Sequence, residues 1–250
     1  MNVANTLTGP TTVSQGTLQL AIGNALSSSA VTVAAGAKLS VGPQVAAVVP
    51  SLVNNGLVDV GLGGLTITAG QNATGIVAGI VAGRADGTWS GTSGITSSAA
   101  ATQGERAVGW LDNGDGSFTV AFAAAGDWNV NGVVDFDDVL QFVSANLYDA
   151  GLPANWADGD FDYNGVVDFD DVLAAVSANL FDTGPYNAPP AGPGLSLAAG
   201  PSGIAAVPEP ATWALAVGGL GAAGFVMLCR GFGRSRTRAH ASTPYGNAGP

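Results

Sequence analysis

The sequence predicts a multidomain protein with an all-β N-terminal region, a small α-helical module built on two cation-binding loops, and a single C-terminal transmembrane helix. Three observations support this prediction. Short apolar runs between glycines fill residues 1–85, an Asp-rich segment starting at Gly126 is repeated from Gly159 onward, and the uncharged segment 211–229 precedes a cluster of arginines. The composition changes sharply between these regions, which favours separate domains.

The N-terminal region, residues 1–85, has the composition of strands and turns and carries almost no charge. Val, Leu, Ile and Thr runs alternate with Gly, Asn and Ser, which is typical of short strands. Gly16, Gly36 and Gly56 are evenly spaced, and alternating apolar residues follow each of them. A degenerate repeat of this size favours a parallel β-helix, or β-solenoid, in which each rung buries its face on the next. An ordinary β-sandwich with similar turns is the alternative.

Residues 5–20, Asn-Thr-Leu-Thr-Gly-Pro-Thr-Thr-Val-Ser-Gln-Gly-Thr-Leu-Gln-Leu, resemble the autotransporter-associated β-strand repeat of large bacterial surface proteins. The resemblance covers little more than one rung. Met1 opens almost inside this repeat, with no basic and apolar leader before it. We therefore expect the chain to be the C-terminal portion of a longer exported protein, or its start codon to be misplaced.

Residues 86–125 are predicted to form a loop and a β-hairpin. The loop, 87–103, is rich in Gly, Ser, Thr and Ala. Residues 107–111 and 117–122 alternate like paired strands around the turn 112–116, and the hairpin is a candidate cap for the solenoid. The carboxylates of this turn offer a further cation site, but a turn of Asp, Asn and Gly needs no ion.

Each copy of the duplicated segment, residues 126–183, has the pattern of a calcium loop. Oxygen-bearing side chains fall at positions 1, 3, 5, 9 and 12 counted from the first Asp, Gly132 or Gly165 stands at position 6, and position 7 offers a main-chain carbonyl. The predicted ligands of the first loop are Asp127, Asn129, Asn131, Val133, Asp135 and Asp138. Those of the second loop are Asp160, Asp162, Asn164, Val166, Asp168 and Asp171. The recurrence of ligands, glycine and a following apolar pair favours two Ca²⁺ sites over two ordinary turns.

The same segment resembles a dockerin-like duplicated module, whose repeats consist of a calcium loop and one helix and whose last ligand is Asp instead of the Glu of an EF-hand. In cellulosomal dockerins, small hydroxyl residues at positions 10 and 11 contact cohesin. Those positions are here Phe136, Asp137, Phe169 and Asp170. The resemblance therefore implies calcium binding, and it does not carry cohesin binding over.

A short helix is expected after each loop. The apolar residues recur at helical spacing, as Val139, Leu140, Val143 and Leu147 and again as Val172, Leu173, Val176 and Leu180. These stripes are predicted to form the core of the module, where the two repeats pack together, and a groove for a partner is the alternative.

Charge is strongly segregated along the chain. Most of the 18 acidic residues are Asp within 126–183, a segment without Lys or Arg. Such a density of like charge opposes compaction, so the sequence predicts bound divalent cations. The pattern is not that of a nucleic-acid-binding protein. A single cysteine, Cys229, excludes a framework of internal disulfides.

The C-terminal region begins with a Pro-, Gly- and Ala-rich segment, 184–206, which is predicted to be a flexible linker. The following segment, 207–238, contains the predicted transmembrane helix 211–229, and 239–250 is a predicted disordered tail. In a helix, 211–229 would be about 28 Å long, enough to cross a membrane. The flanking arginines predict a single span with the N-terminal side outside. A buried core helix is the alternative.

This C-terminal order resembles the PEP-CTERM sorting signal of bacterial envelope proteins. The residues that carry the resemblance are Pro208, Glu209, Pro210, Arg230, Arg234, Arg236 and Arg238. In that family, a membrane-embedded exosortase is thought to cleave near Pro-Glu-Pro, so the resemblance implies an exosortase-type processing enzyme as a partner. It also implies a membrane-anchored precursor and a mature protein at the cell surface or outside the cell.

No catalytic constellation is visible in the sequence. The only histidine, His240, lies in the basic tail, and no nucleophile motif, phosphate-binding loop or zinc pattern occurs. We therefore expect a non-enzymatic structural or adhesive protein of the cell envelope or extracellular matrix, with an envelope scaffold or a polysaccharide as a further partner. A dockerin-bearing component of an extracellular polysaccharide-degrading assembly is the alternative.

Overall fold

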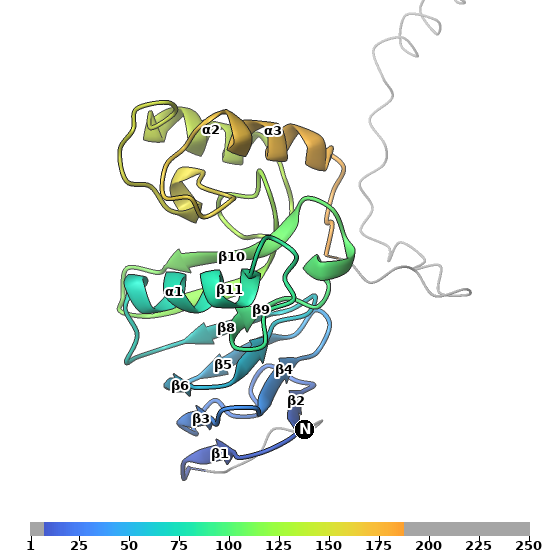
Figure 1. The fold of residues 1–250 in the computed structure, drawn as a ribbon, viewed down its shortest axis with the longest axis vertical. Helices are drawn as coiled ribbons and strands as arrows, with labels where there is room; N and C mark the ends of the chain where they lie inside the picture. Colours follow the sequence, from blue (N-terminus) through green and yellow to red (C-terminus); the bar gives the residue numbers. More distant parts are fainter. Residues whose placement is uncertain (1–7, 188–250) are drawn as a thin grey trace, which may run out of the picture. The chain divides into compact units, whose positions relative to one another are not determined.

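The computed structural model describes residues 8–187, which lie within one compact unit. In Figure 1 the chain passes from a stack of short strands, through one helix and a hairpin, to the two helices of the duplicated segment. Parallel sheets and helices therefore belong to the same unit.

Short parallel strands stack in three sheets. The first contains β1 (Thr11–Val13), β3 (Val31–Val33) and β6 (Leu52–Asn54). The second contains β2 (Thr17–Leu20), β4 (Lys38–Val41), β7 (Leu57–Asp59) and β9 (Gly94–Thr96). The third begins with β5 (Ala46–Val49) and β8 (Gly64–Ile67). Successive turns of the chain lie on one another, since Val31 pairs with Thr11 on one side and with Leu52 on the other.

Glycines stand at the corners between the first and second sheets. Gly16, with a φ of 69°, and Gly36, with a φ of 78°, adopt the left-handed conformation that penalises a side chain. One turn further on, a Cβ on Gly56 would lie 2.3 Å from the Ala34 carbonyl oxygen. The regular glycine spacing in the sequence therefore marks real corners of the stacked strands.

The interior of the stack is aliphatic, with one charged exception. Its fully buried side chains include Leu39, Val49, Val58, Leu65 and Ile67. Asp59 on β7 is also buried, and its carboxylate lies 2.6 Å from the Nζ atom of Lys38 on the neighbouring β4. The same carboxylate accepts hydrogen bonds from the N–H groups of Gly61 and Ser98 at 2.9 and 2.8 Å. This buried charge is thus compensated within the stack.

Helix α1 (Ala73–Arg84) and strand β9 belong to the N-terminal region. Asn72 caps the helix through its side-chain oxygen, and β9 pairs in parallel with β7. The helix approaches β9 so closely that a Cβ on Gly83 would lie 2.0 Å from the Ile95 carbonyl oxygen. Small helix residues are therefore required at this contact.

A hairpin of β10 (Arg106–Asp112) and β11 (Phe118–Ala124) follows the short 3-10 helix η1 (Ala100–Thr102). Strand β11 also pairs in the antiparallel direction with β8, with Val120 opposite Leu65. The apolar residues Phe118, Val120 and Phe122 are buried. The hairpin thereby extends the third sheet and covers the edge that β8 would otherwise expose.

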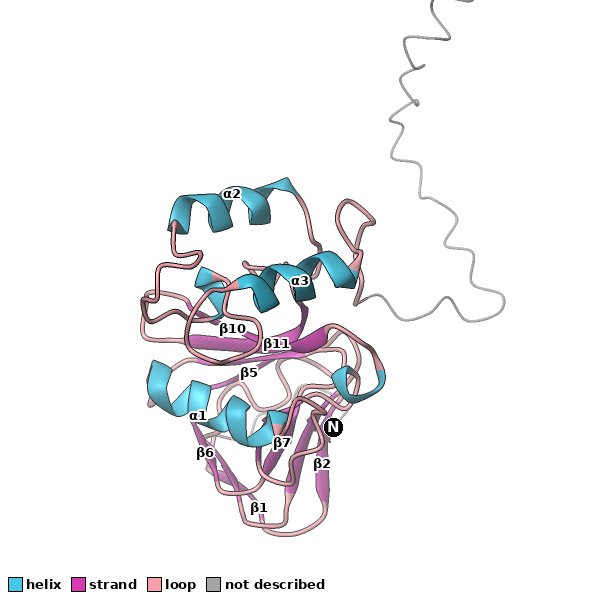
Figure 2. Ribbon diagram, turned by 45° about the horizontal axis from the view of Figure 1, so that its top comes forward, coloured by secondary structure: helices cyan, strands magenta, loops and turns pink. Residues whose placement is uncertain are grey.

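The duplicated segment forms α2 (Phe136–Ala145), the 3-10 helix η2 (Trp156–Asp158) and α3 (Phe169–Ala178), which Figure 2 shows beyond the hairpin. Trp156 is fully buried, and a Cβ on Gly109 of β10 would lie 2.8 Å from its ring. A single hydrophobic cluster includes residues of the stack, the hairpin and this segment. The duplicated segment therefore shares its core with the sheets.

The two repeats pair with each other reciprocally. Val134 of the first loop forms a β-bridge with Phe181, which follows α3, and Val167 of the second loop forms one with Tyr148, which follows α2. The N–H groups of the residues after these aromatics donate to Val134 and Val167 carbonyls at 2.9 Å in both cases. Val134 and Val167 are equivalent positions of the two repeats, and so are Tyr148 and Phe181. The repeats are therefore related by an approximate two-fold symmetry.

The apolar helix stripes do not form the closed core that the sequence suggested. Leu140, Val143, Leu173 and Val176 are between 49% and 70% exposed. Between α2 and α3 lies an apolar groove of about 430 Å³, whose lining includes Trp128, Phe142, Phe161 and Ala175. Among the lining residues Trp128 and Phe161 are buried. The residues of the two stripes that line the groove are Val139, Val172, Val176 and Leu180.

The fold class predicted from the sequence is wrong. The N-terminal region is not all-β, because α1 packs on its strands. The duplicated segment is not an isolated helical module, because its buried aromatics join the hydrophobic cluster of the sheets. The structure instead has mixed β/α architecture with parallel sheets in one compact unit.

The transmembrane part of that prediction has no counterpart in the described structure. Within residues 8–187, none of the helices combines the length and the apolar character that crossing a bilayer requires. The predicted span, 211–229, lies outside the described residues, as do the linker from 188 onward and the tail.

Candidate metal centre

The first loop starts shortly after β11, which ends at Ala124, and the second starts shortly after η2, which ends at Asp158. Each ends in a helix, because its position-9 Asp is the N-cap of α2 or α3. Asp135 and Asp168 accept hydrogen bonds at 2.9 Å from the N–H groups of Asp137 and Asp170. The short loops thus have both ends fixed by secondary structure.

The position-1 carboxylates hold the loops in their coiled shape. Asp127 accepts hydrogen bonds from the N–H groups of Asn131 and Gly132 at 3.1 and 2.9 Å. Asp160 accepts equivalent bonds from Asn164 and Gly165, both at 3.0 Å. Each carboxylate is therefore turned toward the centre of its own loop.

The position-12 carboxylates close the loops from the other side. Asp138 accepts from the N–H groups of Trp128 and Asp135 at 3.0 and 2.9 Å. Asp171 accepts at 2.7 Å from Phe161 and, like Asp138, at 2.9 Å from the position-9 N–H group. These bonds draw the start of each helix toward the start of its loop. Asp can therefore stand where the longer Glu ends an EF-hand loop.

The side chains at positions 3 and 5 curve the loops further. Asn129 and Asp162 accept from the N–H groups two positions further along the chain, at 3.0 and 2.9 Å. Asn131 and Asn164 accept from the N–H groups of the position-7 residues Val133 and Val166 at 2.8 and 2.9 Å. Successive turns of this kind direct alternate side-chain oxygens toward a common point.

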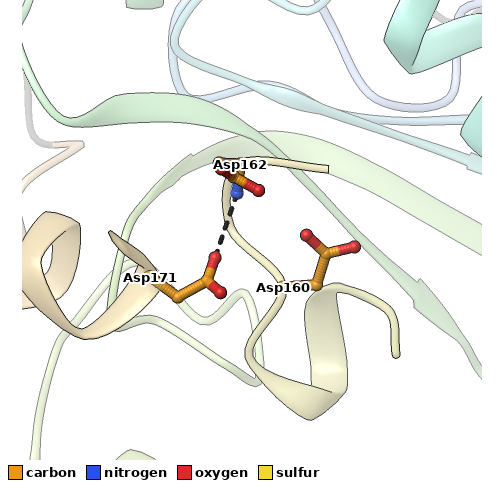
Figure 3. Close-up of side chains that lie close together, drawn as sticks. All are labelled: Asp160, Asp162 and Asp171. Atoms are coloured by element: carbon orange, nitrogen blue, oxygen red, sulfur yellow. Dashed lines mark hydrogen bonds between the residues drawn. The ribbon is translucent and has the colours of Figure 1, made fainter. Parts of the chain in front are cut away.

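Three carboxylates converge in the second loop. One oxygen each of Asp160, Asp162 and Asp171 lies within 4.8 Å of the others (Figure 3). Asp162 also donates its backbone N–H to the Asp171 carboxylate at 3.3 Å. The first loop has Asn129 where the second has Asp162, so its oxygen donors carry one negative charge fewer.

These carboxylates are buried without a positive partner. The exposed fractions of Asp127, Asp138, Asp160 and Asp171 do not exceed 3%. Among residues 8–187 the single ion pair joins Lys38 to Asp59, far from the loops in sequence. Buried charges without compensation are strongly unfavourable, so a bound cation or protons would stabilise these loops.

The pKa shifts follow from the same burial. Loss of hydration raises the pKa of Asp127 to about 6 and that of Asp160 to about 7, and repulsion from Asp138 and Asp171 respectively adds to the increase. Burial likewise raises the pKa values of Asp138 and Asp171. Protons thus compete for the positions that a cation would occupy.

Three aromatic residues that the ligand pattern does not include hold the loops in place. The Trp156 indole N–H donates to the Asp127 carbonyl oxygen at 2.8 Å. The Tyr163 hydroxyl donates to the Val108 carbonyl oxygen of β10, and the Tyr186 hydroxyl donates to the Asp127 carboxylate. The only sequence signal for them is the presence of aromatics within or next to an Asp-rich segment.

The remaining predicted site residues, those of the sorting signal, lie outside the described residues. They are Pro208, Glu209, Pro210, Arg230, Arg234, Arg236 and Arg238. Comparison of the chain with protein-family models, with curated proteins and with solved structures found no match. Function therefore has to be argued from the residues and their geometry.

Proposed function

We propose that this chain is a non-enzymatic protein that binds two Ca²⁺ ions and has a structural or adhesive role at the cell envelope or in the extracellular matrix. The observation that carries the calcium proposal is the burial of two carboxylates in each loop, none of which forms an ion pair with a basic side chain of residues 8–187. The donors are all oxygens, the ligand type that hard cations prefer.

The loops suit Ca²⁺ better than other common cations. Each offers five side-chain oxygens and the position-7 carbonyl within one short loop, and Ca²⁺ accepts roughly six to eight oxygens in flexible geometry. Mg²⁺ keeps several waters and seldom occupies an all-protein cage of this kind. Zn²⁺ is mostly held by His and Cys, and neither loop contains them. When bound, Ca²⁺ would neutralise the buried carboxylates and fix the loops on the hairpin.

Calorimetric titration of the full chain with CaCl₂, and separately with MgCl₂, tests this proposal. We expect two calcium sites and much weaker magnesium binding. If the chain takes up no calcium at millimolar concentration, or binds magnesium equally well, the assignment fails.

The structural or adhesive role is supported by the stacked sheets and by the lack of a catalytic constellation in the sequence. The chain has one histidine and one cysteine, and both lie outside the described residues. A rigid stack of parallel strands joined to a cation-locked segment is suited to a mechanical role. Loss of cell-to-cell or cell-to-surface attachment after gene deletion, restored by the intact gene, would support this role.

Export is proposed from the C-terminal residues alone. The resemblance of 207–238 to a PEP-CTERM signal supports delivery to the cell envelope and processing by an exosortase-type enzyme near Pro208, Glu209 and Pro210. Mass spectrometry of the mature protein from the native envelope would locate its C-terminus. A chain that still ends at Pro250 and is recovered from the cytoplasm would contradict this proposal.

A second candidate function is docking to a scaffold in an extracellular polysaccharide-degrading assembly. The observation that favours it is the exposed apolar surface of the two helices. Its side chains occur in pairs at equivalent positions of the two repeats, Phe136 and Phe169, Leu140 and Leu173, and Val143 and Val176. A pull-down against cohesin-type domains discriminates the two functions, because a purely structural protein would show no calcium-dependent capture.

A further inference from the structure

The first loop has a contact that its duplicate lacks. The Tyr186 hydroxyl donates a hydrogen bond to Oδ2 of Asp127, the position-1 residue of the first loop. Among the described residues, the corresponding Asp160 of the second loop accepts only from backbone N–H groups of its own loop. The two loops therefore differ in the hydrogen bonds to the position-1 carboxylate.

Tyr186 also connects the first loop to the hairpin. Its hydroxyl oxygen accepts a hydrogen bond at 3.0 Å from the N–H group of Ala124, the last residue of β11. A chain of two hydrogen bonds thus runs from the strand, through the phenol, to the carboxylate. The Asp127 N–H donates to the Ala124 carbonyl at 3.0 Å, so strand and loop are joined on both sides.

The tyrosine ring is held by its surroundings. It lies 5.9 Å from the Phe122 ring, and the guanidinium carbon of Arg106 lies 5.5 Å from its centre. The Tyr186 N–H donates to the Gly132 carbonyl at 3.1 Å, directly at the position-6 turn of the first loop. With ring and backbone both fixed, the hydroxyl has little freedom to leave Asp127.

The hydrogen bonds divide the two oxygens of Asp127 into different roles. Oδ2 accepts from both Tyr186 and Gly132, whereas Oδ1 accepts only from Asn131 at 3.1 Å. Oδ2 is thus the more fully occupied oxygen, and Oδ1 retains more capacity for a cation. Partners of this kind orient a ligand and raise the affinity of a metal site.

We propose that Tyr186 is a positioning residue of the first calcium site, which it ties to the end of β11, and that none of residues 8–187 has this role at the second site. This inference rests on the proposed calcium binding. It adds that the two sites differ in their support as well as in their charge. The second loop has the additional carboxylate, Asp162, whereas the first has an oriented position-1 ligand.

Tyr163 provides a matched control. Its hydroxyl also fastens a loop to the hairpin, but it donates to the main-chain carbonyl of Val108 and to none of the predicted ligands. Tyr163→Phe and Tyr186→Phe therefore each remove a hydroxyl oxygen that connects a loop to the hairpin. Only the second of them removes a hydrogen bond from a calcium ligand.

The test uses the full chain in two single-site backgrounds. Asp171→Ala removes the last ligand of the second loop and leaves the first site, and Asp138→Ala does the converse. With Asp171→Ala, adding Tyr186→Phe should weaken calcium binding about tenfold, the lower end of the effect of losing such a partner. With Asp138→Ala, where only the second site remains, Tyr186→Phe should leave calcium affinity unchanged. With Asp171→Ala, Tyr163→Phe should leave the affinity of the first site unchanged.

A second measurement keeps the test valid if a single-site chain does not fold. In the chain with both loops intact, Tyr186→Phe should increase the separation of the two binding constants about tenfold if the second site binds more tightly. Three results would overturn the inference and leave the proposed function intact. Tyr186→Phe could leave the affinity of the first site unchanged, or it could weaken both sites equally. Tyr163→Phe could weaken the first site as much as Tyr186→Phe does. A parent chain that binds no calcium would overturn both the inference and the proposed function.

Discussion

The stacked sheets and the duplicated segment both bury carboxylates, but they compensate them differently. In the sheets, Asp59 lies beside Lys38 and accepts two further hydrogen bonds from backbone N–H groups. In the loops, Asp127 and Asp160 are equally buried and no basic side chain pairs with them among the described residues. The first region therefore supplies its own counter-charge, whereas in the proposed function the second takes its counter-charge from bound calcium. We therefore expect calcium and pH to control the stability of the duplicated segment and hardly to affect that of the stacked sheets.

The largest expected effect is that of calcium itself. At a concentration a thousandfold above the dissociation constant, each site would stabilise the folded chain by about 4 kcal/mol. In metal-free protein, residues 126–183 should therefore lose much of their protection from hydrogen exchange, whereas the strands between 31 and 67 should keep theirs. Hydrogen exchange with mass spectrometry, with and without calcium, measures both. Equal loss in both regions would show that they unfold as one and that calcium does not act on the loops alone.

The next effect concerns single ligands in the second loop. Asp171→Ala removes a buried carboxylate that closes this loop and should abolish one site, which is about half of the calcium stabilisation. Asp170→Ala, next to it in the sequence, removes an exposed carboxylate outside the ligand set and should change little. Calcium-dependent shifts of the unfolding midpoint compare the two variants. Similar shifts for both would contradict the ligand assignment.

A smaller effect on the stability of the folded chain is expected from pH. Its sign should differ between the metal-free and the calcium-bound protein. The folded-state pKa values of Asp127 and Asp160, about 6 and about 7, lie above the ordinary value of 3.8. The folded metal-free chain therefore binds protons more tightly than the unfolded chain, and this stabilisation is lost as pH rises through these values. Metal-free protein should thus be less stable at pH 8 than at pH 5. With calcium the order should reverse, because protons compete with the ion.

Urea unfolding at the two pH values, after metal removal on a chelating resin, measures this reversal. Asp59 gives the contrast within the same chain. Burial alone would raise the pKa of Asp59, but the hydrogen bonds from Lys38, Ser98 and Gly61 together lower it. The Asp59 carboxylate therefore stabilises the folded chain above the pKa that it has in the unfolded chain. This stabilisation is lost only in acid, with or without calcium. Metal-free protein that gains stability from pH 5 to pH 8 would contradict the account of the loops.

The smallest expected effect is that of Lys38→Met. This substitution leaves Asp59 buried without its counter-charge, which commonly costs several kcal/mol, but the Lys38 side chain is 34% exposed. Solvent screening reduces the expected loss to about 1–3 kcal/mol. The loss should be the same with and without calcium in urea unfolding. A loss that calcium abolishes would mean that the two regions are not independent in their electrostatics.

The loops could be predicted in detail because their information is local. One short run of consecutive residues contains every predicted ligand, the Gly at position 6 and the N-cap of the following helix. Hydrogen bonds between residues close in the sequence turn these side chains inward. The bonds that span the most residues within a loop are those from Trp128 to Asp138 and from Phe161 to Asp171. Alternation also predicted the hairpin, since Phe118, Val120 and Phe122 lie on one buried face.

The fold class could not be predicted because it depends on contacts between distant segments. Residues 73–84 are rich in Gly, Val and Ile, which favour helices poorly, and the helix forms because its small residues fit against β9. Residues 94–96 look like part of a polar loop, yet they form a strand on β7. Trp156, Tyr163 and Tyr186 form hydrogen bonds with residues that are far away in the sequence. No local sequence pattern encodes hydrogen bonds of this kind.

Binding of calcium in both loops would be visible in an anomalous diffraction map from crystals grown with calcium, in which we expect two peaks. One should lie among Asp160, Asp162 and Asp171, and the other at the equivalent point between Asp127 and Asp138. Peaks confined to other surfaces, or none at saturating calcium while the loops keep the same hydrogen bonds, would contradict calcium binding in the loops.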